Sequence, residues 1–182
     1  MNDTHVIDEL PGDLMIWVLI VSELLVFGAG LAAFLAVRIT DPVGFATAQD
    51  ALYRTGAGIN TVVLITSGAL AAFALRLSEC ARRGPARLAL LGAAILGVVF
   101  LIIKYVEYAG KAGEGIAWDT HPFFTFYYLL TGFHAAHVAA GVVVLALVAW
   151  QDAPRNIEAG AAFWHMVDLV WVLLFPVIYL LR

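Results

Sequence analysis

Five long runs of apolar residues alternate with short polar segments along this chain. A transmembrane helix needs about 20 predominantly apolar residues, and a run of about 18 or more with few charges is typical of a membrane span. No internal repeat, low-complexity tract or long linker divides the chain, so residues 1–182 are expected to form a single domain. The pattern predicts an all-α integral membrane protein, a five-helix transmembrane bundle with spans at about residues 14–37, 60–77, 88–108, 123–150 and 161–181.

The last run contains two ionisable residues, His165 and Asp168, within the apolar sequence AAFWHMVDLVWVLLFPVIYLL. A charged side chain in hydrocarbon costs about 2.5–3.5 kcal/mol on insertion scales, so both residues are expected to face protein rather than lipid. Residues separated by three positions share a helical face. The spacing of Trp164, Trp171 and Phe175 on that face predicts an aromatic stripe that docks against other helices.

The first run contains one acid, Glu23, which lies about 14 Å from the start of the span at 1.5 Å per residue and hence near the middle of the bilayer. One interpretation is a protonated carboxyl group that is hydrogen-bonded to a neighbouring helix. The functional alternatives are a proton relay and a contact to a lipid or to another subunit. The sequence leaves these alternatives open.

The second and third spans carry further polar residues. In the third span, Lys104 and Glu107 can pair at i and i+3, and Lys104 can also extend towards the membrane interface. The second span has a face of small and polar side chains that suits helix packing, at Asn60, Thr61, Thr66, Ser67 and Gly68.

The fourth span is longer than one bilayer crossing needs and begins with aromatic residues. These residues suit an interfacial belt and lie at Phe123, Phe124, Phe126, Tyr127 and Tyr128. The sequence TGFHAAHVAAG follows and places His134, His137 and Gly141 on one face.

The connections between the spans predict a local helix and an orientation. Asp41 and Pro42 are typical of a helix N-cap followed by proline at the first helical position, so a short interfacial helix is expected in residues 39–58. Arginines crowd the connection between the second and third spans, and the positive-inside rule makes that connection cytoplasmic. Five spans then put the N-terminus inside and the C-terminus outside. The arginines are Arg76, Arg82, Arg83 and Arg87.

Composition supports the membrane class, because 63% of the residues are hydrophobic and the mean hydropathy is +0.91. The net charge of −4 comes without a basic cluster, so a nucleic-acid partner is not expected. Cys80 is the single cysteine, which excludes an internal disulfide and a cysteine-based metal site within the chain. The first 13 residues contain no lysine or arginine, so no cleaved secretory signal is expected.

Four polar residues in the last two spans are candidates for a metal or haem site: His134, His137, His165 and Asp168. Imidazole and carboxylate suit zinc, iron or copper, and His134 and His137 are close enough in sequence to share an ion. However, the chain lacks the Glu-x-x-His spacing of di-iron bundles. The favoured interpretation is that these side chains form hydrogen bonds between helices and lock the last two spans together. No serine has the context of a nucleophile.

Two motifs resemble subunit III of the haem–copper oxidases. The run FWHMVDLVWVLLFPVIYL resembles the closing helix of that family, and TGFHAAHVAAG resembles the helix before it. Glu23, the Asn60-Thr61 pair with Ser67, and Glu107-Tyr108 extend the likeness over nearly the whole chain. The matching positions in the two motifs are Trp164, His165, Asp168, Trp171, Phe175 and Tyr179, and Thr131, Gly132, His134, His137 and Gly141.

The resemblance implies the fold of the last five helices of the seven-helix forms, in which two extra N-terminal helices make a lipid-filled cleft. The chain is similar to the quinol-oxidase subunit III and to the NorE-type proteins associated with nitric oxide reductase. Lys104 departs from the family pattern, where many members have a neutral polar residue. The resemblance implies a non-catalytic, cofactor-free subunit, with structural phospholipid and the catalytic subunit I of a haem–copper oxidase or nitric oxide reductase as partners.

The candidate functional contacts are therefore those of buried polar and aromatic side chains that meet other helices, lipid or a second subunit. They are Glu23, Asn60, Glu107, His134, His137, His165, Asp168, Trp164 and Trp171. A small transporter or proton-relay protein that acts alone is the alternative from another functional class, and a membrane cytochrome is a third. The expected location is a bacterial-type inner membrane.

Overall fold

The computed structural model describes residues 14–151 and 154–181, and these residues form helices joined by short turns without any strand. Five helices are long and apolar enough to cross a membrane. The predicted all-α bundle is thus confirmed, whereas the sequence before residue 14, where no signal was expected, lies outside the described residues. In chain order the elements are α2 (Leu14–Thr40), α3 (Pro42–Asp50), α4 (Arg54–Glu79), α5 (Arg83–Gly113), α6 (Pro122–Gln151), α7 (Pro154–Phe175) and the π-helical turn η1 (Pro176–Leu180).

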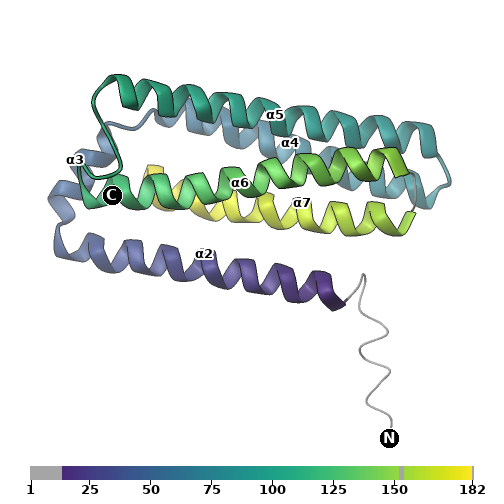
Figure 1. Cartoon of the computed structure of the whole chain (residues 1–182), viewed down its shortest axis with the longest axis horizontal. Helices are drawn as coiled ribbons and strands as arrows, with labels where there is room; N and C mark the ends of the chain where they lie inside the picture. Colours follow the sequence, from purple (N-terminus) through teal and green to yellow (C-terminus); the bar gives the residue numbers. More distant parts are fainter. Residues whose placement is uncertain (1–13, 152–153, 182) are drawn as a thin grey trace, which may run out of the picture.

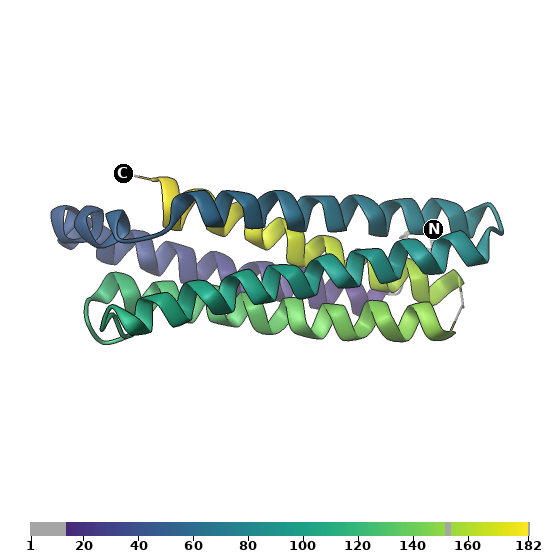
Figure 2. The ribbon, with the colours of Figure 1, turned by 90° about the horizontal axis from the view of Figure 1, so that it is seen from above.

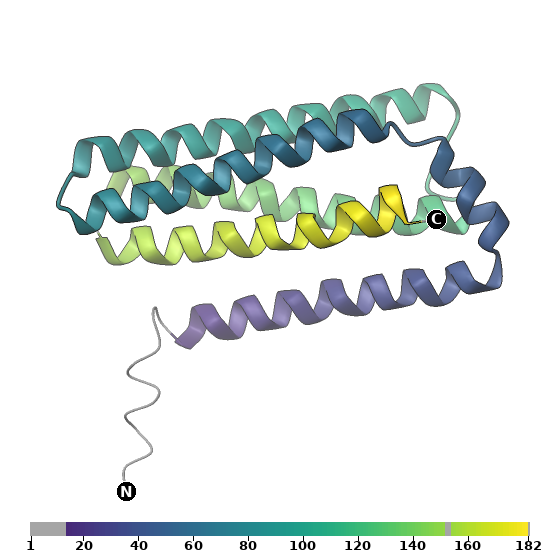
Figure 3. The same cartoon turned by 180° about the vertical axis from the view of Figure 1, so that it is seen from behind.

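The long helices lie side by side and run nearly parallel to one axis (Figures 1 and 2). Helices α4, α5, α6 and α7 pack into a four-helix unit, and α2 lies along its α6 and α7 side (Figure 3). Only Phe27 and Phe34 of α2 are buried. Most of α2 therefore presents apolar side chains to the surroundings, as expected for a helix in lipid or against another chain.

The helices extend beyond the apolar runs that predicted them. Helix α4 begins at Arg54 rather than near residue 60, and α5 continues to Gly113. Hydropathy marks only the part of a helix that lies in hydrocarbon, whereas the backbone hydrogen bonds continue into the polar segments. The connection after α5 is consequently shorter than the sequence suggested.

A short helix is present where the Asp-Pro pair predicted one. The Asp41 carboxylate accepts a hydrogen bond of 3.0 Å from the Gly44 backbone N–H and caps α3, and Pro42 occupies its first turn. His121, in the connection to α6, lies 3.2 Å from the same carboxylate. The hydrogen bond from Gly44, with the contribution of His121, lowers the pKa of Asp41 below its ordinary value of 3.8.

Side chains of α2 and α3 hold the C-terminal turn. Gln49 Nε2 donates 2.9 Å to the carbonyl of Ile178, and Arg38 Nη1 donates 2.5 Å to the carbonyl of Leu181. Proline lacks a backbone N–H, so Pro176 breaks the regular helical ladder at this point. The two long-range hydrogen bonds compensate for carbonyls at the helix end and fix the position of Tyr179.

The centre of the four-helix unit is built around Trp164, which is fully buried. Its ring lies between Gly97 of α5 and Gly141 of α6, and a Cβ at either glycine would lie 2.6 Å from a ring atom. Both glycines are needed because the helices approach the indole too closely for any side chain.

The aromatic start of α6 does not form the interfacial belt that was expected. Phe123, Phe124 and Tyr127 are buried. Their rings pack against one another and, through Phe123, against Phe34 of α2. The prediction was wrong for these residues because α3 and the α2 terminus cover this end of α6, so the rings face protein.

We predict that Gly141→Ala destabilises the protein by about 1–3 kcal/mol, although alanine favours helix over glycine, because the new methyl group overlaps a rigid indole. Thermal unfolding of the purified protein in detergent measures the effect. Gly28→Ala is the matched control, since a Cβ there has no atom within 4 Å. Equal stability of the two variants would contradict the packing assigned to Trp164.

We predict that the α3 cap weakens in acid. Because the folded pKa of Asp41 is depressed, its contribution is present above 3.8 and is lost as the pH falls through the folded value. Hydrogen exchange at the Gly44 amide, corrected for its intrinsic rate, should rise at that pH. Asp41→Asn keeps a capping oxygen but cannot titrate there, so a rise that persists in this variant would assign the effect elsewhere.

Candidate functional site

The most charged cluster inside the bundle joins Lys104 and Glu107 of α5 to Tyr127 of α6 and Tyr179 of η1. Lys104 Nζ lies 2.9 Å from Glu107 Oε2, and the two side chains are only 2% and 7% exposed. The ammonium also donates to the hydroxyls of Tyr179 (2.5 Å) and Tyr127 (3.3 Å). Both hydroxyls donate 2.8 Å to Glu107 Oε1. The predicted ion pair is thus confirmed, and it is part of a closed network across three elements.

Aromatic rings surround the same ammonium. Lys104 Nζ lies 4.7 to 5.6 Å from four ring centroids, a range in which a cation is attracted to the ring face. The rings belong to Tyr108, Tyr127, Trp171 and Tyr179. The local spacing predicted Glu107 as a partner. The other partners come from distant helices, so no local sequence signal identified them.

Glu23 of α2 lies against α6. Its Oε2 is 3.1 Å from His137 Nε2, and the side chains of Glu23 and His137 are 24% and 16% exposed. His137 Nδ1 lies 2.9 Å from the Phe133 carbonyl, which can only accept, so Nδ1 carries hydrogen and Nε2 faces the acid. The mid-membrane acid is therefore in contact with a neighbouring helix, but Glu23 Oε2 makes no hydrogen bond among the described residues, unlike the bonded carboxyl group that was expected. A role as a relay or a subunit contact stays a prediction.

His134 is fully buried and lies among aromatic rings. It stacks on Trp171 of α7, with 5.1 Å between centroids, and contacts the edge of Phe100 of α5 at 5.6 Å. Neither ring nitrogen has a hydrogen-bond partner among the described residues. His134 thus joins α6 to α7 by stacking rather than by the hydrogen bond that was expected.

Asp168 and His165 of α7 contact each other loosely, with 3.8 Å between Oδ2 and Nδ1. The Asp168 carboxylate lies against Gly68 of α4, where a Cβ would collide with it. His165 is 46% exposed, so the expectation that it faces protein holds only in part. Trp164 and Trp171 occupy the buried face of α7, and His165 lines a hollow of about 390 Å³ together with residues of α2.

The hypothesis that four polar residues lock α6 to α7 is therefore wrong for most of them. His137 contacts α2, and Asp168 lies against α4. His165 contacts Asp168 of its own helix. His134 does contact the neighbouring helix of the pair, through Trp171.

Two indole N–H groups of α7 bind α4 instead. Trp164 Nε1 donates 3.0 Å to Ser67 Oγ, and Trp171 Nε1 donates 2.9 Å to Thr61 Oγ1. Ser67 Oγ in turn donates a hydrogen bond of 2.7 Å to a backbone carbonyl of α5. Asn60 Nδ2 also reaches a carbonyl of α5, at 3.3 Å. The predicted packing face is thus confirmed at Asn60, Thr61, Ser67 and Gly68, but the tryptophan donors were missed. Thr66 is exposed and donates to the Val62 carbonyl of its own helix, so the prediction was wrong there.

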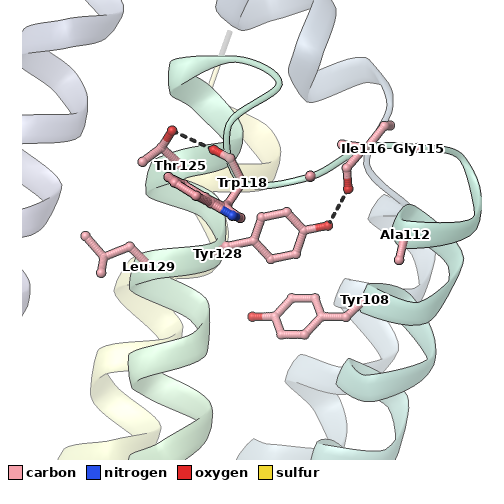
Figure 4. Close-up of a pocket in the computed structure, with 9 residues that line it drawn as sticks. Tyr108, Ala112, Gly115, Ile116, Trp118, Thr125, Tyr128 and Leu129 are labelled. Atoms are coloured by element: carbon pink, nitrogen blue, oxygen red, sulfur yellow. Dashed lines mark hydrogen bonds between the residues drawn. The ribbon is translucent and has the colours of Figure 1, made fainter.

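A hollow of about 750 Å³ lies where α5, α6 and their connection meet (Figure 4). Tyr108, Tyr128 and Trp118 line it. Tyr128 donates 3.0 Å to the Ile116 carbonyl and Thr125 donates 2.7 Å to the Trp118 carbonyl, as the figure shows. These hydroxyl groups already make hydrogen bonds within the protein, so the hollow offers mainly apolar surface.

The polar and charged side chains inside the bundle mainly make contacts between helices. In residues 14–151 and 154–181 no group of three His, Cys, Asp or Glu side chains could hold a metal ion. The charged and hydroxyl groups of the Lys104 cluster satisfy one another, as polar groups in hydrocarbon must. Such an arrangement fixes the relative positions of α5, α6 and η1.

Comparison with known proteins gives a consistent result. Residues 12–182 match the family model described as cytochrome c oxidase subunit III. Cytochrome c oxidase subunit 3 of Synechocystis sp. is 28% identical over 175 residues, which cover 89% of this chain and 72% of the relative. A probable quinol oxidase subunit 3 of Staphylococcus epidermidis is 25% identical over 173 residues, covering 91% of this chain and 86% of the relative.

A third relative is a heme-copper oxidase subunit I+III of Aeropyrum pernix, which is 28% identical over 179 residues. The match covers 90% of this chain and 22% of the longer relative. Together with the five apolar helices, the family match identifies a multi-pass membrane protein. The resemblance drawn from the two sequence motifs is confirmed: the chain belongs to the cytochrome c oxidase subunit III family.

Proposed function

We propose that this protein is an accessory subunit, without a cofactor of its own, of a respiratory haem–copper oxidase or nitric oxide reductase complex. The catalytic subunit I of that complex is its partner, and phospholipids fill the remaining surface. The protein stabilises the catalytic subunit, its bound lipid and its proton uptake during electron transport. The narrower assignment to the NorE-type branch is part of the same proposal.

The observation that carries this proposal is the Aeropyrum pernix relative named subunit I+III, in which a subunit III sequence is matched within a longer chain of that name. Two sequences joined in one chain are held next to each other, which supports a contact between subunits I and III. The packing of this protein suits such a contact, since α2 leaves a long apolar face uncovered by the other helices.

Glu23 and His137 supply the link to proton uptake in this proposal. Their side chains are partly exposed near the middle of α2 and α6, so they are accessible from the membrane side of the bundle. An acid and an imidazole in contact can share a proton between them. The same pair is the observation that favours the alternative, a small transporter or proton-relay protein that acts without a redox enzyme.

The proposed location is a bacterial-type inner membrane with the N-terminus in the cytoplasm and the C-terminus outside. The cluster of arginines at the α4–α5 connection supports this orientation through the positive-inside rule.

We predict that the tagged protein, solubilised gently from its own membranes, brings a haem-containing subunit I with it. Peptide identification and a visible spectrum of the eluate measure this. A colourless protein that elutes alone and moves protons in liposomes would favour the independent relay, and a coloured protein that elutes alone would establish a cytochrome.

In the same assay, Lys104→Met should reduce the amount of subunit I recovered, because it leaves the buried Glu107 charge without its cation, at a cost of about 3–5 kcal/mol. The double variant Lys104→Met/Glu107→Gln removes both charges and should recover part of the loss. The haem spectrum of the complex that remains should be unchanged. A normal yield with an altered haem spectrum would contradict the supporting role.

We predict that Cys80 is labelled by a membrane-impermeant thiol reagent in inverted vesicles but not in right-side-out vesicles. Cys80 is exposed, is the single cysteine, and lies at the arginine-rich α4–α5 connection. The matched control is Cys80→Ser combined with Trp118→Cys in the α5–α6 connection, which should show the reverse pattern. Labelling of Cys80 from the outside would reverse the orientation.

A further inference from the structure

Another hollow lies between α5 and the beginning of α4, beside the α3–α4 connection at the α3 end of the bundle. It has a volume of about 520 Å³, within the range of small-molecule sites. Its apolar wall is formed by Ile102, Ile103 and Val106 of α5 together with Leu52. Helices α4 and α5 lie on the opposite side of the bundle from α2, as Figure 1 shows, so we call this hollow the α4–α5 groove.

The groove becomes more charged along α5. Ile102 and Val106 lie deeper in the membrane span, and Lys111 and Glu114 lie at the end of the helix. Glu107 also lines the groove between them, but its carboxylate is held by Lys104 and the two tyrosines of the cluster. From residue 102 to residue 114 the helix rises about 18 Å at 1.5 Å per residue. A phospholipid in one leaflet has the same order of polarity, with acyl chains towards the middle of the bilayer and the headgroup at the surface.

The charged end of the groove is an ion pair with unused capacity. Lys111 Nζ lies 2.6 Å from Glu114 Oε2, and the side chains are 8% and 56% exposed. An ammonium has three donors, and the described contacts give Lys111 one acceptor. A carboxylate accepts several hydrogen bonds, and Glu114 is open to the surface. The pair can therefore bind a second pair of opposite charges.

We propose that the α4–α5 groove binds phosphatidylethanolamine, with the lipid phosphate at Lys111, its primary ammonium at Glu114 and one acyl chain along Ile102 and Val106. The charges decide the headgroup. A quaternary ammonium lacks the N–H donors that a carboxylate accepts, and an anionic glycerol headgroup offers no cation to Glu114.

This site differs from the lipid cleft that the family resemblance implies, since two extra N-terminal helices make that cleft, whereas this chain's own residues form the α4–α5 groove. It also does not rest on the proposed function. The inference requires only that α4 and α5 span a membrane, whether or not a catalytic subunit binds the protein.

The test uses the full-length chain, purified in detergent, stripped of lipid and titrated with phosphatidylethanolamine, with native mass spectrometry to count bound molecules. Gly110→Leu places an apolar side chain at the groove, and its Cβ has room because no atom lies within 4 Å of that position. We expect about tenfold weaker binding. Gly113→Leu is the matched control: a Cβ there is equally free, and Gly113 does not line the groove, so binding should be unchanged.

The headgroup is tested separately. Glu114→Gln should reduce the preference for phosphatidylethanolamine over phosphatidylglycerol, as the ratio of their affinities, about tenfold, because one charge-assisted hydrogen bond is lost. Equal binding of phosphatidylethanolamine by the Gly110→Leu and Gly113→Leu variants would overturn the site, as would equal binding of the two lipids by the unaltered protein. Recovery of subunit I with the unaltered protein tests the proposed function independently of either result.

Discussion

The cost of an unpaired charge in hydrocarbon is the constraint on which the α3 end of the bundle depends. Lys104 and Glu107 lie inside the span of α5 and are almost completely covered. Their charges can remain there only if hydrogen bonds and opposite charge surround them. Tyr127 and Tyr179 supply those bonds, so α6 and η1 must bring their hydroxyls to one carboxylate oxygen.

This requirement extends to residues that do not touch the pair. Tyr179 reaches the cluster from a π-helical turn, and the carbonyl of its neighbour Ile178 is held by Gln49 of α3. Arg38 of α2 binds the carbonyl of Leu181, just beyond the turn. The first two helical elements thus secure the last one. Arg38 and Gln49 thus connect α2 and α3 to the C-terminal turn that carries Tyr179.

Much of the architecture could be read from the sequence, because membrane spans are set by hydropathy alone. The five spans and the capped α3 were predicted on such local grounds, as was the Lys104–Glu107 pair. Partners on other helices were not accessible in this way. His165 shows the reason: a position three residues from Asp168 fixes the shared helical face, but the rotation of α7 is set by Trp164 and its two glycines.

The same limit explains the polar residues of the last two spans. His134 and His137 lie three positions apart, yet one stacks in the centre of the bundle and the other meets Glu23. A helix with neighbours on two sides presents nearby residues to different partners. Helix α2 lies outside the four-helix unit, and its Glu23 contacts His137, so this histidine faces α2 rather than α7. The histidines therefore connect three helices rather than two.

Helix α5 shows how depth changes the role of one sequence pattern. Lys-x-x-Glu occurs at residues 104–107 and again at 111–114, seven residues later, so both pairs lie on nearly the same face. The deeper pair is enclosed by tyrosines, and Lys104 uses all three of its donors within the cluster. The second pair lies at the end of the span, where Glu114 is largely exposed. The first pair therefore holds helices together, while the second pair is available for the lipid headgroup proposed above.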